Sequence, residues 1–122
     1  MAYNTTQTGR TDTLAPESVP MQFVEGKIVY DSTSITATDY SRFAIGFKPK
    51  YIKVVNVTDR ISVEWFEGMT ASQALLTVAA GTRTLDTTAN QFVIDDRGFS
   101  LLQNGTVAVL VASVTVCFIA YG

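Results

Sequence analysis

The acidic side chains are the first place to look for chemistry, because they are the chain's only candidates for general acid–base work. Glu64 and Glu67 flank the single tryptophan and a phenylalanine in the sequence Glu-Trp-Phe-Glu. Positions three apart on a β-strand point to opposite faces, so these two carboxylates cannot address one substrate locally. Asp95 and Asp96 diverge in the same way, and we expect them to supply polarity to a turn. A glycosidase-type pair drawn from two distant strands stays open at this point.

Missing residue types exclude several kinds of site. The chain has no histidine, which removes Ser-His-Asp and Cys-His catalysis and the commonest zinc ligand. Its one cysteine, Cys117, lies in an apolar run, where we expect a buried small hydrophobe, and it cannot form an internal disulfide. No EF-hand, Walker or GxGxxG pattern is present. We therefore expect no catalytic residue, no cofactor and no metal ligand, and we interpret the chain as a non-enzyme.

Length and charge narrow the remaining classes. The 122 residues suit one domain, and their charged share of 16% is low against an average of about 25%. The net charge is −2 with lysines and arginines scattered, so we expect no nucleic-acid partner. The stretch Gly98–Gly122 carries no charge, but it is rich in valine and threonine, which favour strands over a spanning helix. We therefore expect no membrane segment.

The elements that must position any site begin after a polar N-terminal arm. Residues 1–20 are dominated by Thr, Asn, Gln, Gly and Pro and show no hydrophobic period, so they cannot order themselves by burial. Pro16 and Pro20 favour an extended end to this arm. We expect either a floppy terminus or an arm that orders against a neighbouring subunit, followed by one domain over residues 21–122.

Short apolar runs separated by turn residues fill that domain. The clearest is the hairpin Tyr51–Phe66, with a turn at Asp59-Arg60. In its second half Ile61, Val63 and Trp65 alternate with polar positions, which predicts a half-buried strand with Trp65 in the core. Phe66 shares the polar face, and an aromatic side chain there suggests contact with a loop or another chain. Further strands are expected near Phe23–Tyr30, Arg42–Phe47, 82–86 with Leu85 inward, 91–95 and 106–121.

Three local features are open to more than one interpretation. Gly26 marks a bulge or a turn in the first strand. The stretch Met69–Gly81 forms either a helical turn followed by a strand, which we prefer, or one short helix. Asn104-Gly105 lies between apolar runs, where it predicts a type I′ hairpin or a cap on a single helical turn, and Ser113 is a plausible break further on. In all, the sequence predicts an all-β fold: one antiparallel sandwich or jelly-roll-like domain of about eight short strands with an extended arm.

Three parts of the hairpin region carry a resemblance to a known class of protein. They are Gly-Phe-Lys-Pro-Lys-Tyr-Ile at Gly46–Ile52, Val-Asn-Val-Thr-Asp at Val55–Asp59, and Glu-Trp-Phe-Glu-Gly-Met at Glu64–Met69. In these parts the chain resembles small virion structural proteins of tailed bacteriophages. The resemblance implies a capsid decoration (cement) protein or another small head or tail component, and it implies no catalytic residues.

These observations lead to three hypotheses of function. The first is a capsid decoration protein on the virion surface, made in the bacterial host cytoplasm. It would staple subunits of the major capsid protein as a homo-oligomer, a dimer or a trimer. The second is a tail-associated, receptor- or carbohydrate-binding module, to which Tyr30, Tyr40 and Tyr51 could contribute. The third, an enzyme, is disfavoured by the missing histidine. The candidates for protein contacts are Tyr3, Arg10 and Leu14 in the arm, and Phe66 and Met69 at the strand end.

Overall fold

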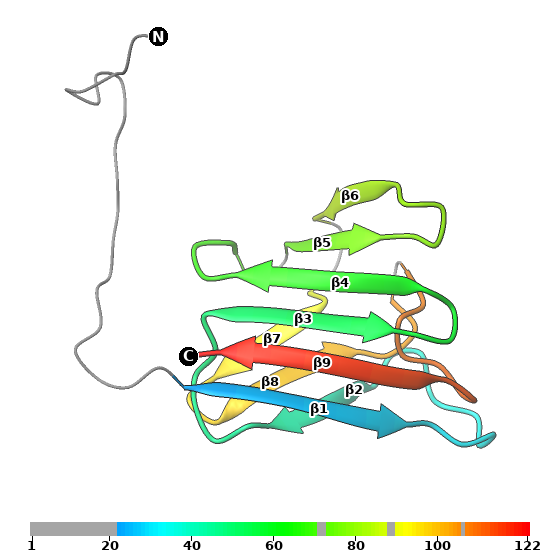
Figure 1. Cartoon of the computed structure of the whole chain (residues 1–122), viewed down its shortest axis with the longest axis horizontal. Helices are drawn as coiled ribbons and strands as arrows, with labels where there is room; N and C mark the ends of the chain where they lie inside the picture. Colours follow the sequence, from blue (N-terminus) through cyan, green and yellow to red (C-terminus); the bar gives the residue numbers. More distant parts are fainter. Residues whose placement is uncertain (1–21, 71–72, 88–89, 106) are drawn as a thin grey trace, which may run out of the picture.

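A computed structural model gives the fold and describes residues 22–70, 73–87, 90–105 and 107–122 (Figure 1). The described residues form an all-β structure of nine strands in two antiparallel sheets, consistent with the predicted β-sandwich. The predicted arm, residues 1–20, lies outside the described residues. The strands are β1 (Phe23–Val29), β2 (Tyr40–Ala44), β3 (Tyr51–Asn56), β4 (Ile61–Phe66), β5 (Ala74–Thr77), β6 (Arg83–Asp86), β7 (Phe92–Asp95), β8 (Gly98–Leu102) and β9 (Thr115–Tyr121).

The large sheet has six strands in the order β1-β9-β3-β4-β5-β6. The predicted hairpin forms β3 and β4, and Arg60 at its turn takes a positive φ of 61°. β9 lies between β1 and β3, so the first and last described strands are neighbours (Figure 1). β3 is therefore an interior strand, as its dense apolar sequence predicts.

The small sheet has the order β2-β8-β7 and lies behind the large sheet in Figure 1. Its two outer strands are tied across β8 by a bidentate ion pair, in which the Arg42 guanidinium donates to Asp95 at 2.7 and 2.8 Å. The hydrogen bond from Arg42 and a second from the backbone N–H of Arg97 lower the pKa of Asp95 to about 2. Asp95 thus has the turn-forming role that the sequence predicts.

The core lies between the two sheets. In the small sheet, Phe99 contacts both Phe43 and Phe92, with ring centroids 4.6 and 5.9 Å apart. Phe43 and Phe99 in turn meet Phe118 of β9 edge-on, at 4.9 and 6.3 Å. Trp65 is buried with them, as predicted. The other buried apolar side chains are Ile52, Val54, Val63, Ala74, Leu76, Leu101, Val109, Leu110, Val114, Val116 and Ala120.

The expectation for Asn104-Gly105 was wrong. Asn104 does take a left-handed φ of 48°, but the residues that follow do not pair back onto β8, which is already bonded to β2 and β7. The backbone N–H of Asn104 instead donates to the carbonyl of Leu110 at 2.9 Å. Residues 107–114 form no strand among the described residues, and their apolar side chains enter the core between the sheets. Burial of this loop therefore explains its hydrophobicity better than pairing does.

Two further expectations, for Leu85 and for Gly26, were wrong. Leu85 points outward, because β6 pairs with β5 so that Leu85 lies opposite Leu75, while Asp86 takes the inward position. The Asp86 carboxylate accepts a hydrogen bond there from the side-chain amide of Gln91 at 2.9 Å. Gly26 makes neither a bulge nor a turn, since β1 pairs with β9 without interruption. A Cβ at Gly26 would lie 2.6 Å from the Phe118 ring, so close packing accounts for the glycine.

The strand that we preferred for the stretch after Gly68 is present as β5, whereas the helical turn expected before it includes residues 71 and 72. The backbone N–H of Gln73 donates to the carbonyl of Thr70 at 3.0 Å, and β5 follows at once. Residues 71 and 72 lie outside the described part of the chain. The described ranges contain no helix and therefore no helix that could cross a membrane.

Candidate contact surface on the outer face of the large sheet

The outer face of the large sheet turns away from the core and carries a row of four aromatic side chains. Phe23, Tyr121, Tyr51 and Phe66 lie opposite one another in register across β1, β9, β3 and β4. Their ring centroids are 5.2, 5.6 and 4.8 Å apart along the row. We call these four residues the aromatic row. Cross-strand aromatic pairs of this kind stabilise a sheet while leaving their outer edges available.

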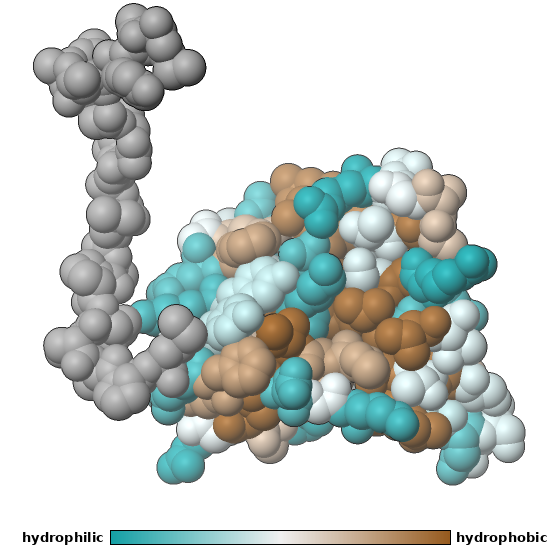
Figure 2. All heavy atoms as spheres, viewed as in Figure 1, coloured by the Kyte–Doolittle hydropathy of each residue, from teal (hydrophilic) through white to brown (hydrophobic). Residues whose placement is uncertain are grey.

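Both ends of the aromatic row are open to solvent. Phe23 is 50% exposed and Phe66 is 45% exposed, and Phe66 therefore occupies the surface position that the sequence predicts. The two tyrosines between them are half-buried. Figure 2 shows apolar side chains on this face over β1, β9 and β3, interrupted by hydrophilic ones. A ridge of partly exposed rings is an unfavourable surface to leave in water and is typical of a contact with another molecule.

A buried carboxylate fixes one ring of the row. The Tyr51 hydroxyl donates to Glu64 at 2.8 Å, and Arg83 of β6 donates to the other oxygen of the same carboxylate at 2.7 Å. Glu64 is only 7% exposed, although its strand position places it on the face expected to be polar. Burial is the largest cause that raises the pKa of Tyr51, and the hydrogen bond to Glu64 is the second. Together they bring this pKa to about 12. The phenol is thus held neutral and in a defined orientation at ordinary pH.

Next to the aromatic row runs a second cross-strand row that alternates charge and apolar surface. Glu25, Ile119, Lys53 and Glu64 follow one another in register from β1 to β4. An open depression of about 200 Å³ lies here, lined by Glu25, Lys53, Val55, Cys117, Phe118 and Ile119. The charged side chains therefore border the aromatic row, which forms an apolar strip, on one long side. The strand ends border this strip on the other side.

The turn after β4 places the second predicted contact residue differently from Phe66. Met69 is half-buried and packs against the core, and its sulfur accepts a hydrogen bond from the Phe66 backbone N–H at 3.2 Å. The Met69 backbone N–H donates to the Phe66 carbonyl at 3.0 Å. Met69 therefore supports the position of Phe66 and offers less surface than expected. Tyr3, Arg10 and Leu14 lie outside the described residues.

Two of the carboxylates that the sequence analysis considered for chemistry make structural hydrogen bonds. Glu64 is committed to Tyr51 and Arg83, and Asp95 to Arg42. Within residues 22–70, 73–87, 90–105 and 107–122, no group of three or more His, Cys, Asp or Glu side chains could hold a metal ion. Cys117 is half-buried on the outer face rather than fully buried, because nothing among the described residues covers that side of β9.

The aromatic row itself was missed by the sequence analysis, which singled out only Phe66 for this face. A usable pattern was present: Phe23 and Tyr51 begin their strands, whereas Phe66 and Tyr121 end theirs. In an antiparallel sheet these positions fall at the same end. The strand order needed to join them was missing, because β9 enters the sheet from the far end of the sequence. No protein-family model, curated protein or solved structure matches the chain.

Proposed function

We propose that the chain is a non-enzymatic structural protein of a phage virion, which decorates the capsid and staples neighbouring subunits of the major capsid protein. The observation that carries the proposal is the outer face of the large sheet with its partly exposed aromatic row. Aromatic side chains dominate the energetics of protein contacts when they are rigid and near the centre of an interface. The rings of the aromatic row pack against one another, which restrains them, and they lie on a face that has no covering layer among the described residues.

Rigidity of the aromatic row supports a contact role further. Tyr51 is held by Glu64, and Glu64 by Arg83, so the central ring loses little conformational freedom on binding. Each ring also packs against its neighbour along the row. A surface ordered in advance converts more of its buried area into affinity than a mobile one does.

The segments that resemble phage virion proteins coincide with this surface. Gly46–Ile52 leads into β3 and contains Tyr51, while Glu64–Met69 ends β4 and contains Phe66. Val55–Asp59 supplies the turn between the two strands. Two of the four rings therefore belong to the resembling segments. We accordingly propose a virion location on the capsid surface, synthesis in the bacterial cytoplasm, and a homo-oligomeric state.

The proposal is tested by binding to undecorated shells. Empty capsids of the encoding phage, assembled without this chain, are mixed with the purified protein and sedimented. The double variant Phe23→Ser, Phe66→Ser removes the exposed ends of the aromatic row, and Val93→Ser changes an equally exposed residue of the small sheet. We expect wild type and Val93→Ser to saturate the shells, and the row variant to bind at least about tenfold more weakly. Failure of the wild type to bind shells would contradict the proposal.

A tail-associated, receptor- or carbohydrate-binding module is the second candidate, favoured by one observation. The open depression beside the aromatic row carries both a carboxylate and an ammonium group, from Glu25 and Lys53, which could bind sugar hydroxyls. The rings of the row pack against one another, however, which leaves less of each ring free to stack on a sugar. A glycan array decides between the two: selective binding abolished by Lys53→Ala would favour the module.

A further inference from the structure

We propose that the aromatic row binds residues 14–20 of the N-terminal arm of a second copy of this chain. The inference rests on the proposed function in one respect, namely that the aromatic row is a protein contact, and it assigns that contact to a second copy within the decorating oligomer.

The strip suits a single extended segment rather than a second sheet. It is one side chain wide, since the charged row of Glu25 and Lys53 borders it on one side. It crosses four strands and is therefore about 14 Å long, from a strand spacing of about 4.8 Å. An aromatic side chain buries about 150–250 Å², and these are already half covered, so the row offers about 300 Å². A stable interface between folded faces needs about 800 Å² per partner, which the strip does not supply.

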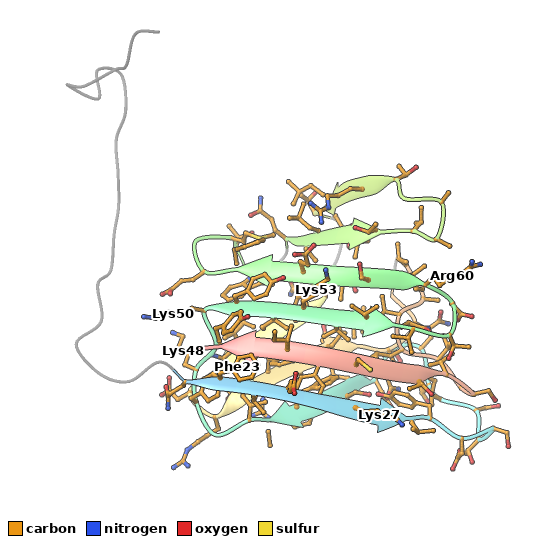
Figure 3. All side chains as sticks on the ribbon, viewed as in Figure 1. Phe23, Lys27, Lys48, Lys50, Lys53 and Arg60 are labelled. Atoms are coloured by element: carbon orange, nitrogen blue, oxygen red, sulfur yellow. The ribbon has the colours of Figure 1, made fainter. Side chains whose placement is uncertain are left out.

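The segment Leu-Ala-Pro-Glu-Ser-Val-Pro, residues 14–20, has the matching chemistry. Proline-containing segments bind rows of aromatic side chains because they are extended before binding and lose little entropy. At about 3.1 Å per residue in that conformation, seven residues span about 20 Å and cover the strip. The segment's single charge is Glu17. Figure 3 shows the exposed Lys48 at the same end of the sheet as Phe23, so a charge of opposite sign lies near this end of the row.

The path of the chain favours the arm of a neighbour over the protein's own arm. The Gln22 carbonyl accepts a hydrogen bond from the Gly122 N–H at 2.8 Å, so the chain enters β1 along the strand axis. The aromatic row runs across the strands, and only Met21 separates Gln22 from Pro20. Proline fixes its own φ and keeps the preceding residue extended, which opposes the sharp turn a return would need. The arm of a second copy does not need to make this turn. When each of two copies binds the arm of the other, the contacts close a symmetric oligomer.

The test measures the molar mass of the full-length chain by light scattering at about 100 μM, a concentration that reveals micromolar association. An arm variant carries Leu14→Ser, Pro16→Ser and Val19→Ser, and its matched control carries Asn4→Ser, Thr6→Ser and Thr8→Ser. The row variant is Phe23→Ser, Phe66→Ser. We expect the wild type and the control to be oligomers, and the arm and row variants each to have the mass of one chain. Circular dichroism confirms that each variant is folded.

Mixing the two defective variants is the decisive step. The arm variant keeps an intact row and the row variant keeps an intact arm, so the mixture can form one arm–row contact. We expect the mass to recover to at least two chains on mixing. A monomeric wild type, or an arm variant that stays oligomeric, would overturn the inference. Either result leaves shell binding by the wild type as a separate readout, so failure of the arm contact and failure of the decoration role are distinguishable.

Discussion

The hydroxyl of Tyr51 and the carboxylate of Glu64 show how one residue pair sets the chemistry of the outer face. A carboxylate that is nearly buried on the outside of a sheet is costly unless its oxygens are bonded. Here one oxygen of Glu64 accepts a hydrogen bond from Tyr51, and the other accepts one from Arg83. Together with Arg83, the pair therefore links β3, β4 and β6 through side chains alone, across β5, which separates β4 from β6.

We expect Glu64→Gln to lower the pKa of Tyr51 from about 12 toward its ordinary value of 10. The shift is incomplete, because burial is the largest cause of the raised pKa and it remains in the variant. Tyrosinate absorbance during an alkaline titration measures the change. Glu25→Gln, an exposed carboxylate of the same face, is the control and leaves the curve unchanged. An unaltered titration of Glu64→Gln would show that Glu64 does not act on Tyr51.

Tyr51→Phe assigns the titration and tests its link to stability. Because the folded state raises the pKa of Tyr51, the stability it contributes is fully present below about pH 10 and is lost as pH rises through about 12. The difference in free energy of unfolding between wild type and Tyr51→Phe should therefore shrink over that interval. A difference that does not vary with pH would contradict the assignment.

Among the elements, β1 depends on the absence of a side chain at Gly26. Gly26 faces the ring of Phe118, and the strand remains in register with β9 only because that ring has room. We expect Gly26→Ala to lower the free energy of unfolding by about 1–3 kcal/mol through overpacking. Urea unfolding measures it.

The double variant Gly26→Ala, Phe118→Leu is the control for that prediction. The smaller side chain makes space for the added methyl group, so the two changes together should cost less than the sum of each alone. Strict additivity of the two effects would mean that the ring does not meet the added atom.

At this scale the sequence predicted the strands that alternate clearly and failed where register or loop burial decides. The alternation in Ile61–Phe66 correctly placed Trp65 inside and Phe66 outside. Leu85 was misplaced because β6 is a four-residue edge strand, whose facing is set by its pairing with β5 rather than by its own pattern. The apolar stretch 107–114 was expected to be a strand, and hydrophobicity alone does not distinguish a strand from a loop that enters the core.

The candidate surface was predictable only in part. Phe66 was identified because a phenylalanine on a polar strand face is conspicuous locally. Phe23 and Tyr121 are nearly a hundred residues apart in sequence, and only their pairing in adjacent strands makes them neighbours. A pattern confined to one segment cannot contain that information.

For the whole molecule, the aromatic cluster between the sheets should make both sheets unfold together. Phe99 is fully buried, stacks on Phe43 at 4.6 Å and touches Phe118 of the large sheet edge-on. We expect Phe99→Ala to lower the free energy of unfolding by about 3–5 kcal/mol. Fluorescence of Trp65 reports on the large sheet and circular dichroism on both sheets, so the two urea transitions should shift together.

Val93→Ala is the control for the urea unfolding of Phe99→Ala, since Val93 is exposed in the same small sheet. It should move the transition by less than about 0.5 kcal/mol. If Phe99→Ala shifted the dichroism but left the Trp65 transition in place, the two sheets would be separate folding units.

The place of β9 in the large sheet has a consequence for how the protein is made. β1 has β9 as its only partner among the described strands, and β3 needs β9 on one side. A nascent chain that has released β1 through β8 from the ribosome therefore has a gap in the middle of its larger sheet. Unpaired strand edges favour aggregation, and pairing between distant segments is slow. The domain must then fold after translation reaches Tyr121, and a ribosome stalled shortly before that point would display two open sheet edges.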